Sequence, residues 1–371
     1  MTDAPNDICL TSSIAEISWK AFSSNWNIVA SKLPKNVGIL PMVKTNAYGH
    51  DMQIIADYCT KLSAIGLGVA NIFEALELRS LGYEKQIVSF GRLNPETLDA
   101  AFEFDIQVVV HNPNDVDLLL RCPHMISFHL EIETGMNRLG VHFEEIDNVL
   151  DMVKKKPHKV KGVFTHFVES EIKESTYTRR QIQKFQRAIS YVKSKRLGKF
   201  ITHAENSGGI FNQKKHFDWV RPGLALYGYH PNEKTTKHGL RPVLEWSAPI
   251  IQINRLKKGD YVSYNRSFRA KKDMVIATLP VGYGDGFSRK YKTQHVGYQN
   301  QSCAIVGNIC MDLMMIDISR MKNPQVGDMV YLLGPGAHGE ASAWNHAKVD
   351  RTIPYEVLTR ISPRVIRTPS T

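Results

Sequence analysis

The stretch GILPMVKTNAYGH, residues 38–50, decides the fold prediction because it joins an apolar run to a lysine and a turn. The run from Gly38 to Val43 is short and apolar, which is typical of a buried strand. Lys44 follows it directly, at the C-terminal end of this predicted strand. Parallel β/α barrels build their active sites at that end of the strands. The stretch therefore predicts the first strand of such a barrel, with Lys44 at its functional face.

The same unit recurs from about residue 37 to residue 228, where short apolar runs alternate with amphipathic stretches. Eight runs are predicted strands: GILPMV, AIGLGVA, QIVSF, IQVVV, MISFHLEI, VKGVFTHF, FITHA and DWVRPG. The stretches between them carry helical spacing, as at Ile54, Tyr58 and Leu62. Eight such units predict an α/β fold, a (β/α)8 TIM-like barrel.

The sequence changes character after about residue 240. Helical periodicity gives way to β-branched runs, alternating polarity and turn signals such as Lys-Gly-Asp at 258–260. These features indicate a mainly antiparallel β domain. We expect the barrel to span residues 12–238 and the C-terminal β domain residues 239–371, with residues 1–11 joining the second domain.

The composition is that of a packed globular protein, and the net charge alone excludes no class of soluble protein. The chain has 371 residues, of which 43% are hydrophobic and 22% charged. Lys plus Arg number 47 against 36 for Asp plus Glu, a net charge of +11. A nucleic-acid-binding protein would gather these charges with aromatic residues on one element. Here short runs occur only at 154–156 and 257–258, so we disfavour a nucleic-acid partner.

The sequence shows no pattern that is typical of a secretory signal or a membrane span. The first 20 residues show no basic start followed by an apolar core, so no secretory signal is expected. No apolar run approaches the ~18 residues of a membrane span. The 5 cysteines are scattered without a CxxC pair. We therefore expect no metal site, no disulfide framework, no membrane association and a cytoplasmic location.

Lys44 is the first candidate for chemistry. A lysine at the end of an apolar strand is partly desolvated, which lowers its pKa and suits it to form a Schiff base. On position alone, Lys44 could equally be an ordinary lysine whose ammonium group reaches solvent from a strand end. Polar or charged residues must therefore follow other strands as well before the sequence predicts a site.

Polar or glycine-rich sequence does follow several other strands. The fifth to eighth strands are followed by Arg138, His166, Asn206, Ser207, Arg221 and Gly223. Backbone N–H groups and small side chains in such turns favour a phosphate cradle. Each position alone could be a capped turn or a solvated arginine. With Lys44 after the first strand, five of the eight strand ends carry such residues, which predicts a site at this face.

A family resemblance rests on eight motifs in this order: VKTNAYGH, TGMNRLG, NSGG, RPG, VSYNRSF, VGYGDGF, GNICMD and IPYE. They resemble the signatures of the pyridoxal-phosphate-dependent alanine racemases, of fold type III, from about residue 12 to residue 367. The resemblance implies an isomerase that interconverts L- and D-alanine and supplies D-alanine for cell-wall peptidoglycan. A serine or broad-specificity racemase is the nearest alternative. A decarboxylase of the same fold would usually carry an acidic residue where Arg221 stands.

The resemblance implies a two-base mechanism. Lys44 would hold pyridoxal 5'-phosphate as a Schiff base and move the α-proton on one face of the substrate, and Tyr264 would act on the opposite face. Racemisation needs such a pair, because a single base returns the proton to the side it came from. Free tyrosine titrates near ~10, so Tyr264 would need help from His166 and cationic groups. Arg221 would face the pyridine nitrogen.

Other site residues are implied in the same way. The cofactor-binding residues would be Lys44, Tyr48, Asn206, Ser207, Arg221, Gly223 and Tyr355. Arg138 and Met311 would contact the substrate, while Tyr283 and Asp312 would line the way into the site. In this family the β domain of one chain reaches the barrel of another. The resemblance therefore implies a head-to-tail homodimer in which Tyr264, Tyr283 and Met311 act in trans.

One departure from the family pattern is informative. Glu131, in HLEIETGMNRLG, stands where the family often has a carbamylated lysine that holds the arginine. A carbamate is negatively charged, and a glutamate supplies that charge directly. We predict that Glu131 orients Arg138 without a carbamate and without carbon dioxide, with a water bridging the shorter side chain.

Overall fold

The computed structural model describes residues 12–156, 159–232 and 238–371. The expectation that residues 1–11 join the β domain lies outside this range. The chain forms two compact units, which we describe separately. The barrel unit holds residues 23–47 and 52–240. The β unit holds the remaining described residues, 12–22, 48–51 and 241–371.

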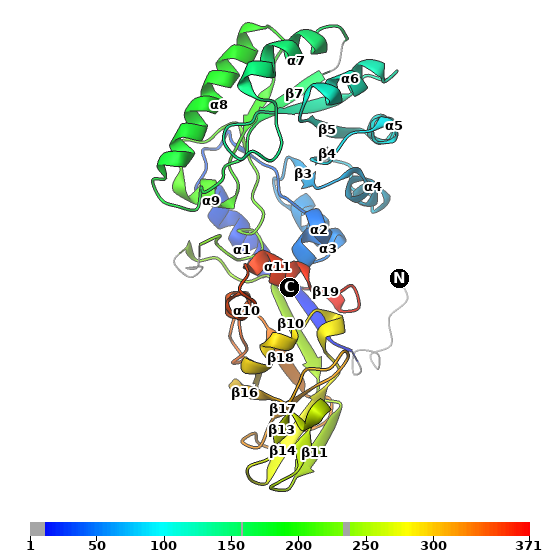
Figure 1. Cartoon of the computed structure of the whole chain (residues 1–371), viewed down its shortest axis with the longest axis vertical. Coiled ribbons are helices and arrows are strands. Elements are labelled where there is room, and N and C mark those ends of the chain that lie inside the picture. The colour runs from blue at the N-terminus through cyan, green and yellow to red at the C-terminus, as the bar shows by residue number, and fades with distance from the viewer. Residues whose placement is uncertain (1–11, 157–158, 233–237) are drawn as a thin grey trace. The chain divides into compact units, whose positions relative to one another are not determined.

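The barrel unit is built on a sheet of eight parallel strands (Figure 1). These are β2 (Gly38–Ile39), β3 (Gly66–Val69), β4 (Gln86–Ser89), β5 (Ile106–Val110), β6 (Ser127–Glu131), β7 (Lys159–Phe164), β8 (Ile201–His203) and β9 (Trp219–Val220). They follow one another in sequence order from β3 to β9, and β2 pairs with β9. A parallel bridge between Met42 and Gly68 joins the two ends of the sheet. The predicted (β/α)8 barrel is confirmed.

Helices alternate with these strands. They are α1 (Trp19–Ala30), α2 (Lys44–Gly49), α3 (Met52–Lys61), α4 (Ile72–Ser80), α5 (Pro95–Glu103), α6 (Pro113–Arg121), α7 (Ile146–Val153), α8 (Thr176–Ser194) and α9 (Ser207–Asn212), with a 3-10 turn η2 (Phe143–Glu145) before α7. Asn71, Asn94 and Asn112 cap α4, α5 and α6 by accepting a backbone N–H of the first turn. These caps fix where each helix leaves the strand that precedes it.

The β unit contains a nine-stranded sheet in the order β11-β14-β17-β16-β15-β18-β10-β1-β19. The strands are β1 (Ile14–Ser18), β10 (Leu244–Pro249), β11 (Gln252–Leu256), β14 (Met274–Leu279), β15 (His295–Tyr298), β16 (Gln301–Val306), β17 (Met314–Asp317), β18 (Met329–Leu333) and β19 (Ile366–Ser370). Every pairing in it is antiparallel except that of β1 with β19. The predicted antiparallel domain is confirmed.

Shorter elements complete the β unit. They are the hairpin β12 (Tyr261–Val262) and β13 (Phe268–Arg269), the turns η4 (Tyr264–Arg266), η5 (Tyr283–Asp285) and η6 (Arg289–Thr293), and the helices α10 (Ala343–Asp350) and α11 (Pro354–Thr359). Strand β1 lies inside the large sheet because both of its edges are hydrogen-bonded, to β10 and to β19. Residues 12–22, which we expected at the start of the barrel, therefore group with the β unit.

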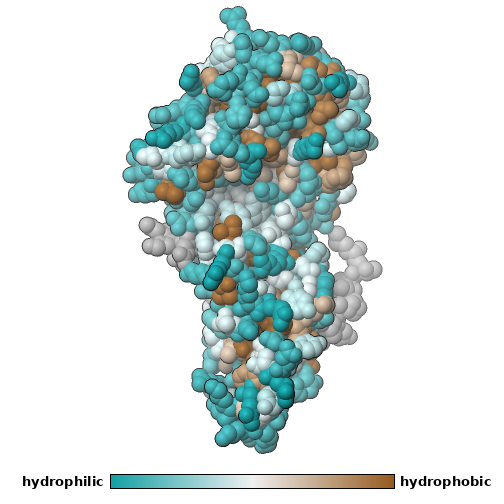
Figure 2. Space-filling model, viewed as in Figure 1, coloured by the Kyte–Doolittle hydropathy of each residue, from teal (hydrophilic) through white to brown (hydrophobic). Residues whose placement is uncertain are grey.

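Hydrophilic residues predominate on the face of the molecule shown in Figure 2. Large apolar side chains that remain exposed include Phe73, Phe102 and Met125 in the barrel unit, and Tyr264 and Met311 in the β unit. Among the described residues, no helix is both long enough and apolar enough to cross a membrane. Two of the exposed side chains, Tyr264 and Met311, are among the predicted site residues.

Candidate active site

Lys44 stands at the start of α2, and the backbone that follows it is left-handed. The φ angles of Thr45, Asn46, Ala47 and Tyr48 are 56°, 49°, 51° and 56°. Left-handed helical conformation costs roughly 1–2 kcal/mol for each residue other than glycine. Four such residues in a row therefore need support from the surrounding structure.

Glu74 of α4 supplies much of that support. One carboxylate oxygen accepts from the N–H of Thr45 at 2.6 Å, and the other accepts from the N–H of Ala70 at 2.7 Å. The side chain of Asn46 accepts from the N–H of Met52 at 2.7 Å. Sequence reasoning missed Glu74, although an acidic residue three positions after the cap of α4 was a visible signal. Its carboxylate ties the turn after Lys44 to the end of β3.

Lys44 has a pKa below its ordinary value. Partial burial is the largest cause, and the positive charges of Arg138 and Arg221 act in the same direction. Glu74 opposes them by favouring the ammonium form. A lowered pKa raises the fraction of neutral amine at a given pH, and the neutral amine is the nucleophilic form. The structure therefore places a lysine of lowered pKa at the end of the first barrel strand.

Arg221 follows β9 and is buried, with 4% of its surface exposed. Its Nη2 donates to the carbonyl oxygens of Thr165 at 2.9 Å and Ala204 at 3.2 Å. Nη2 also lies 3.2 Å from Nδ1 of His166, and Nη1 is hydrogen-bonded to Nδ1 of His203. Burial lowers the pKa of Arg221 to about 10, so its guanidinium group stays charged at neutral pH. These contacts fix the arginine to the ends of β7 and β8.

His166 follows β7 and is held neutral. Burial lowers its pKa well below the ordinary value, followed in effect by the charges of Arg221, Arg138 and Lys44. A guanidinium group can only donate, so Nδ1 of His166 must accept from Arg221. The ring proton then resides on Nε2. His166 can therefore offer one N–H on the side away from Arg221.

Gln181 of α8 holds two of the strand-end loops together. Its Nε2 donates to Oγ1 of Thr134 at 3.2 Å and to the carbonyl of His166 at 3.0 Å. Its Oε1 accepts from the N–H of Val168 at 3.0 Å. The side chain is buried, with 1% exposed. Gln181 thereby joins the loop that carries Arg138 to the one that carries His166, and sequence reasoning did not identify it.

Replacing Gln181 by leucine is expected to destabilise the fold. The substitution leaves the part-buried carbonyl of His166 and the part-buried N–H of Val168 without partners, each at a cost of about 1–3 kcal/mol. We expect the free energy of unfolding in urea to fall by about 3 kcal/mol. Gln183→Leu is the matched control, because Gln183 is exposed on the same helix. Equal unfolding midpoints for the two variants would contradict the role given to Gln181.

Glu131 has a different partner from the one we predicted. Its Oε2 lies 2.6 Å from Nδ1 of His111, and both side chains are buried. Arg138 is exposed, and no hydrogen bond or ion pair joins it to Glu131 in the described part of the chain. His111 directly follows β5, the neighbour of β6, so its ring meets the carboxylate at the same edge of the sheet. The side chain of Glu131 is shorter than a carbamylated lysine, so its carboxylate meets His111 and does not extend to Arg138.

Ser207 and Gly223 meet at the ends of β8 and β9. The hydroxyl oxygen of Ser207 accepts from the N–H groups of Gly223 and Ala225, each at 3.1 Å. Its own O–H has no acceptor among the described residues, so it can donate to an anion. Asn206 caps α9 by accepting from the N–H of Gly209 at 3.1 Å. The cap fixes the turn in which Ser207 stands.

Six predicted site residues lie in the β unit, and four of them, Tyr264, Tyr283, Met311 and Asp312, are exposed. Tyr264 is 73% exposed, Tyr283 42% and Met311 53%. Asp312 accepts from Nη2 of Arg364 at 2.8 Å. The side chains of Tyr264, Tyr283 and Met311 are therefore available for contacts outside this unit.

Tyr48 and Tyr355 lie together in the β unit, with ring centroids 5.9 Å apart. Gly49 beside them has a φ of 81°, and a Cβ atom there would lie 2.2 Å from the carbonyl oxygen of Leu358. Its own carbonyl accepts from Nε of Arg367 at 3.2 Å. The end of α2 is thus fixed against α11 and the last strand, and glycine is required at position 49.

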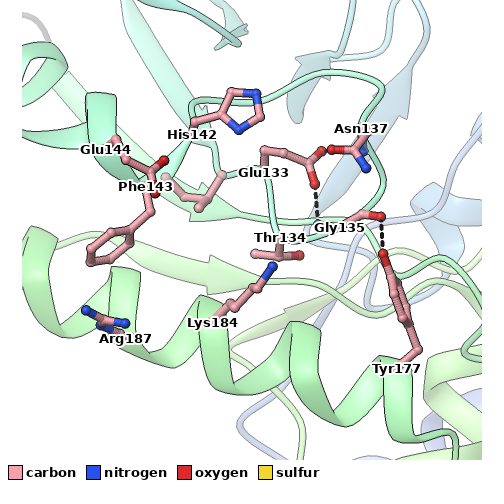
Figure 3. Close-up of a pocket in the computed structure, with 11 residues that line it drawn as sticks. Glu133, Thr134, Gly135, Asn137, His142, Phe143, Glu144, Tyr177, Lys184 and Arg187 are labelled. Carbon is pink, nitrogen blue, oxygen red and sulfur yellow. Dashed lines mark hydrogen bonds between the residues drawn. The ribbon is translucent and has the colours of Figure 1, made fainter.

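A cavity of about 350 Å³ borders the loop that carries Arg138 (Figure 3). Lys184 extends toward this loop from α8, while the guanidinium group of Arg187 lies 4.7 Å from the centre of the Phe143 ring. Tyr177 donates to the carbonyl of Gly135 at 2.6 Å, and Glu133 accepts from the N–H of Gly135. These contacts stabilise the loop from its outer side.

The strand ends of the barrel thus gather Lys44, Arg221 and His166, while Arg138 acts on the pKa values of all three. This arrangement defines a barrel enzyme with a reactive amine among cationic side chains, followed by a β domain. Sequence models of the alanine racemase N-terminal and C-terminal domains match residues 17–231 and 243–369. The chain therefore belongs to the alanine racemase family of isomerases.

Individual relatives agree with this assignment. Alanine racemase of Staphylococcus carnosus is 34% identical over 363 residues, covering 95% of this chain and 93% of its own. The structure of alanine racemase from Clostridium difficile 630 superposes with a TM-score of 0.91 at 29% identity, covering 97% of this chain and 96% of that one. The Bacillus anthracis enzyme, solved with bound L-Ala-P, gives a TM-score of 0.90 at 29% identity, covering 97% and 95%.

Proposed function

We propose that this racemase interconverts L-alanine and D-alanine with pyridoxal 5'-phosphate as cofactor, and that the D-alanine serves peptidoglycan synthesis. The observation that carries the proposal is the lysine of lowered pKa at a barrel strand end, with two arginines acting on it. The relatives named above, all alanine racemases, support alanine as the substrate. Serine or a broader set of amino acids stays the alternative.

The residues of the barrel fit this cofactor. Arg138 and Arg221 lower the pKa of Lys44, and Arg138 also lowers the pKa of Arg221, so the site carries positive charge that an anionic group would relieve. Lys44 would bind the aldehyde carbon, Arg221 would face the ring nitrogen, and the O–H of Ser207 would donate to the phosphate. When bound, pyridoxal phosphate withdraws electrons from the substrate's α-carbon. Tyr48, Asn206, Gly223 and Tyr355 remain proposed contacts as well.

The proton-transfer steps belong to the side chains. The amine of Lys44, once free, takes the α-proton or returns it on one face, and its lowered pKa increases the fraction of neutral amine that can take it. Tyr264 does the same on the other face. The Nε2–H of His166 is available to stabilise the phenolate oxygen that this requires. Arg221 only donates, so it leaves the ring nitrogen unprotonated.

We propose that Tyr264 acts in the site of a second copy, in a head-to-tail homodimer. Its side chain is 73% exposed in this unit, so it is available to enter the site of another chain. Met311 and Tyr283, also exposed, would act in the same second site, with Asp312 beside them. We also propose a cytoplasmic location, because Cys59, Cys122, Cys303 and Cys310 are free thiols.

An absorbance scan of the purified protein tests the cofactor. A Schiff base between Lys44 and pyridoxal phosphate gives a yellow band, which borohydride abolishes by reducing the bond. Reduction should also leave the cofactor covalently attached to the peptide that contains Lys44. A colourless protein that takes up no added pyridoxal phosphate would contradict the proposal. Rates measured on L-alanine and L-serine then separate the two racemase alternatives.

Racemisation is expected to proceed at the same rate with and without carbon dioxide. The negative charge at position 131 is a carboxylate already paired with His111, so no lysine has to be carbamylated there. The check is an assay in buffer stripped of carbon dioxide, repeated after bicarbonate is added back. A rate that falls on stripping and recovers with bicarbonate would show that a carbamate forms elsewhere.

A further inference from the structure

A line of hydrogen bonds runs from Arg221 through the interior of the barrel. Nη1 of Arg221 is bonded to Nδ1 of His203, and Nε2 of His203 lies 2.9 Å from Nδ1 of His129. Nε2 of His129 lies 2.8 Å from Oε1 of Gln107, whose Nε2 donates to Oε1 of Gln86 at 3.1 Å. The line crosses from β9 to β8, β6, β5 and β4 in turn. It therefore links the candidate site to the opposite part of the barrel.

The chemistry of the donors gives this line one direction. A guanidinium group has no acceptor, so Nδ1 of His203 must accept from Arg221. A neutral ring then carries its proton on Nε2, and that proton points to Nδ1 of His129. The same logic places the proton of His129 on Nε2, where Oε1 of Gln107 accepts it. Every bond in the line donates away from Arg221.

The line is sealed from water. His129 and His203 have no exposed surface, and the ring of Phe164 stacks on His203 at 4.7 Å between centroids. Trp219 lies 5.8 Å from the ring of His129. Gly162 makes room for His129, since a Cβ atom there would lie 2.2 Å from Nδ1. Water therefore cannot replace a lost partner in the line without local rearrangement.

Both rings stay neutral over the working range of pH. Burial lowers the pKa of His129 to about 3, and the charges of Arg221 and Lys161 act in the same direction. For His203 the causes are burial, Arg221 and His129, and the pKa again falls well below the ordinary value. A doubly protonated His203 would also present an N–H to Arg221, which has no acceptor for it. Protonation would break the line at its first bond.

We propose that His129 and Gln107 are positioning residues that fix the tautomer of His203 and thereby the orientation of Arg221. The carbonyl of Gln107 selects the Nε2–H form of His129, which in turn selects the Nε2–H form of His203. In the other tautomer, His203 would direct an N–H at the guanidinium group and repel it. The effect on racemisation rests on the proposed function of Arg221, whereas the tautomers do not depend on it.

Nitrogen-15 NMR of the holoenzyme labelled at histidine tests the tautomers directly, because the chemical shift of each ring nitrogen shows whether it carries a proton. Substitution of each histidine in turn assigns the signals. We expect His129 and His203 to give neutral Nε2–H signals that do not change from about pH 5.5 to about pH 9, a range that includes the ordinary histidine pKa. Titration of either ring in this range, or an Nδ1–H form, would overturn the proposal.

Substitutions at the far end of the line test the effect on the site. Gln107→Leu removes the acceptor of His129, and Gln86→Leu is the matched control because it leaves that acceptor in place. Gln107→Glu keeps an acceptor oxygen. We expect Gln107→Leu to shift the His203 signal and to lower kcat about tenfold with little change in KM, and Gln107→Glu to retain the wild-type tautomer.

Outcomes for this proposal and for the proposed function are separable. If Gln107→Leu matches Gln86→Leu in both spectrum and kcat, the positioning role is wrong even when the enzyme racemises alanine. If the wild-type protein binds no pyridoxal phosphate, the proposed function fails while the wild-type tautomers still decide the direction of the line. Should Gln107→Leu not fold, the wild-type spectra and the Gln107→Glu variant carry the test.

Discussion

Lys44→Ala is expected to reduce the racemisation of L-alanine by roughly 10³-fold or more, since it removes the group that we propose both holds the cofactor and moves the proton. The yellow band should be lost as well, because alanine has no amine to bond the aldehyde. We propose this role for Lys44 rather than for another lysine because burial and two arginines lower its pKa at the strand end. The measurement is the rate of D-alanine formation together with the absorbance spectrum.

Lys184→Ala is the matched control for this experiment. Lys184 lies on α8 at the outer side of the barrel and is exposed, so its removal should leave both rate and spectrum unchanged. Circular dichroism of both variants shows whether the barrel still forms. Undiminished racemisation by Lys44→Ala would remove Lys44 from its proposed role.

Tyr264→Phe is expected to lower racemisation by about 10²–10⁴-fold while leaving the cofactor bound. The phenol would handle the proton on one face only, so its loss should affect the two enantiomers differently. In deuterated water, one enantiomer of alanine should still exchange its α-proton through Lys44, and the other should not. The measurement is exchange followed by mass spectrometry, beginning from each enantiomer separately.

Tyr261→Phe is the control for the second substitution, because Tyr261 is also exposed and lies in the adjacent strand β12. Mixing Lys44→Ala chains with Tyr264→Phe chains tests the proposed action in trans. A mixed dimer would contain one site with both bases intact, so activity should partly return. Equal loss of exchange for both enantiomers in Tyr264→Phe would argue against a second base at this position.

The barrel and most of its site could be predicted because their physical signals are local. Apolar runs marked the eight strands, and parallel strands bring the residues that follow them to one edge. This is why Lys44, His166 and Arg221, which lie far apart in sequence, were expected together. The order of the strands follows the chain, so the prediction needed no knowledge of long-range pairing.

The left-handed turn after Lys44 could not be predicted. Of the residues in this turn only Asn46 is of a type that tolerates positive φ, and then as a single residue, so the run from Thr45 to Tyr48 has no local preference that would outweigh its cost. The conformation depends on Glu74, which comes from another strand–helix unit. The pairing of Glu131 with His111 was missed for a similar reason, since it depends on the register of β5 against β6. The spacing of apolar residues predicts which segments form strands, but it does not predict the register between two strands or the rotamer of a side chain.

The grouping of Tyr48–Asp51 with the β unit has a consequence for dissecting the chain. The polypeptide passes between the two units after Phe22, Ala47, Asp51 and Leu240. A fragment ending at Leu240 would keep β1 and the Tyr48–Asp51 segment but lose the strands and helix against which they pack. No single cut in the chain therefore yields both units intact. During synthesis, the segment Tyr48–Asp51, next to Lys44, acquires its native neighbours only after strand β19 has been made.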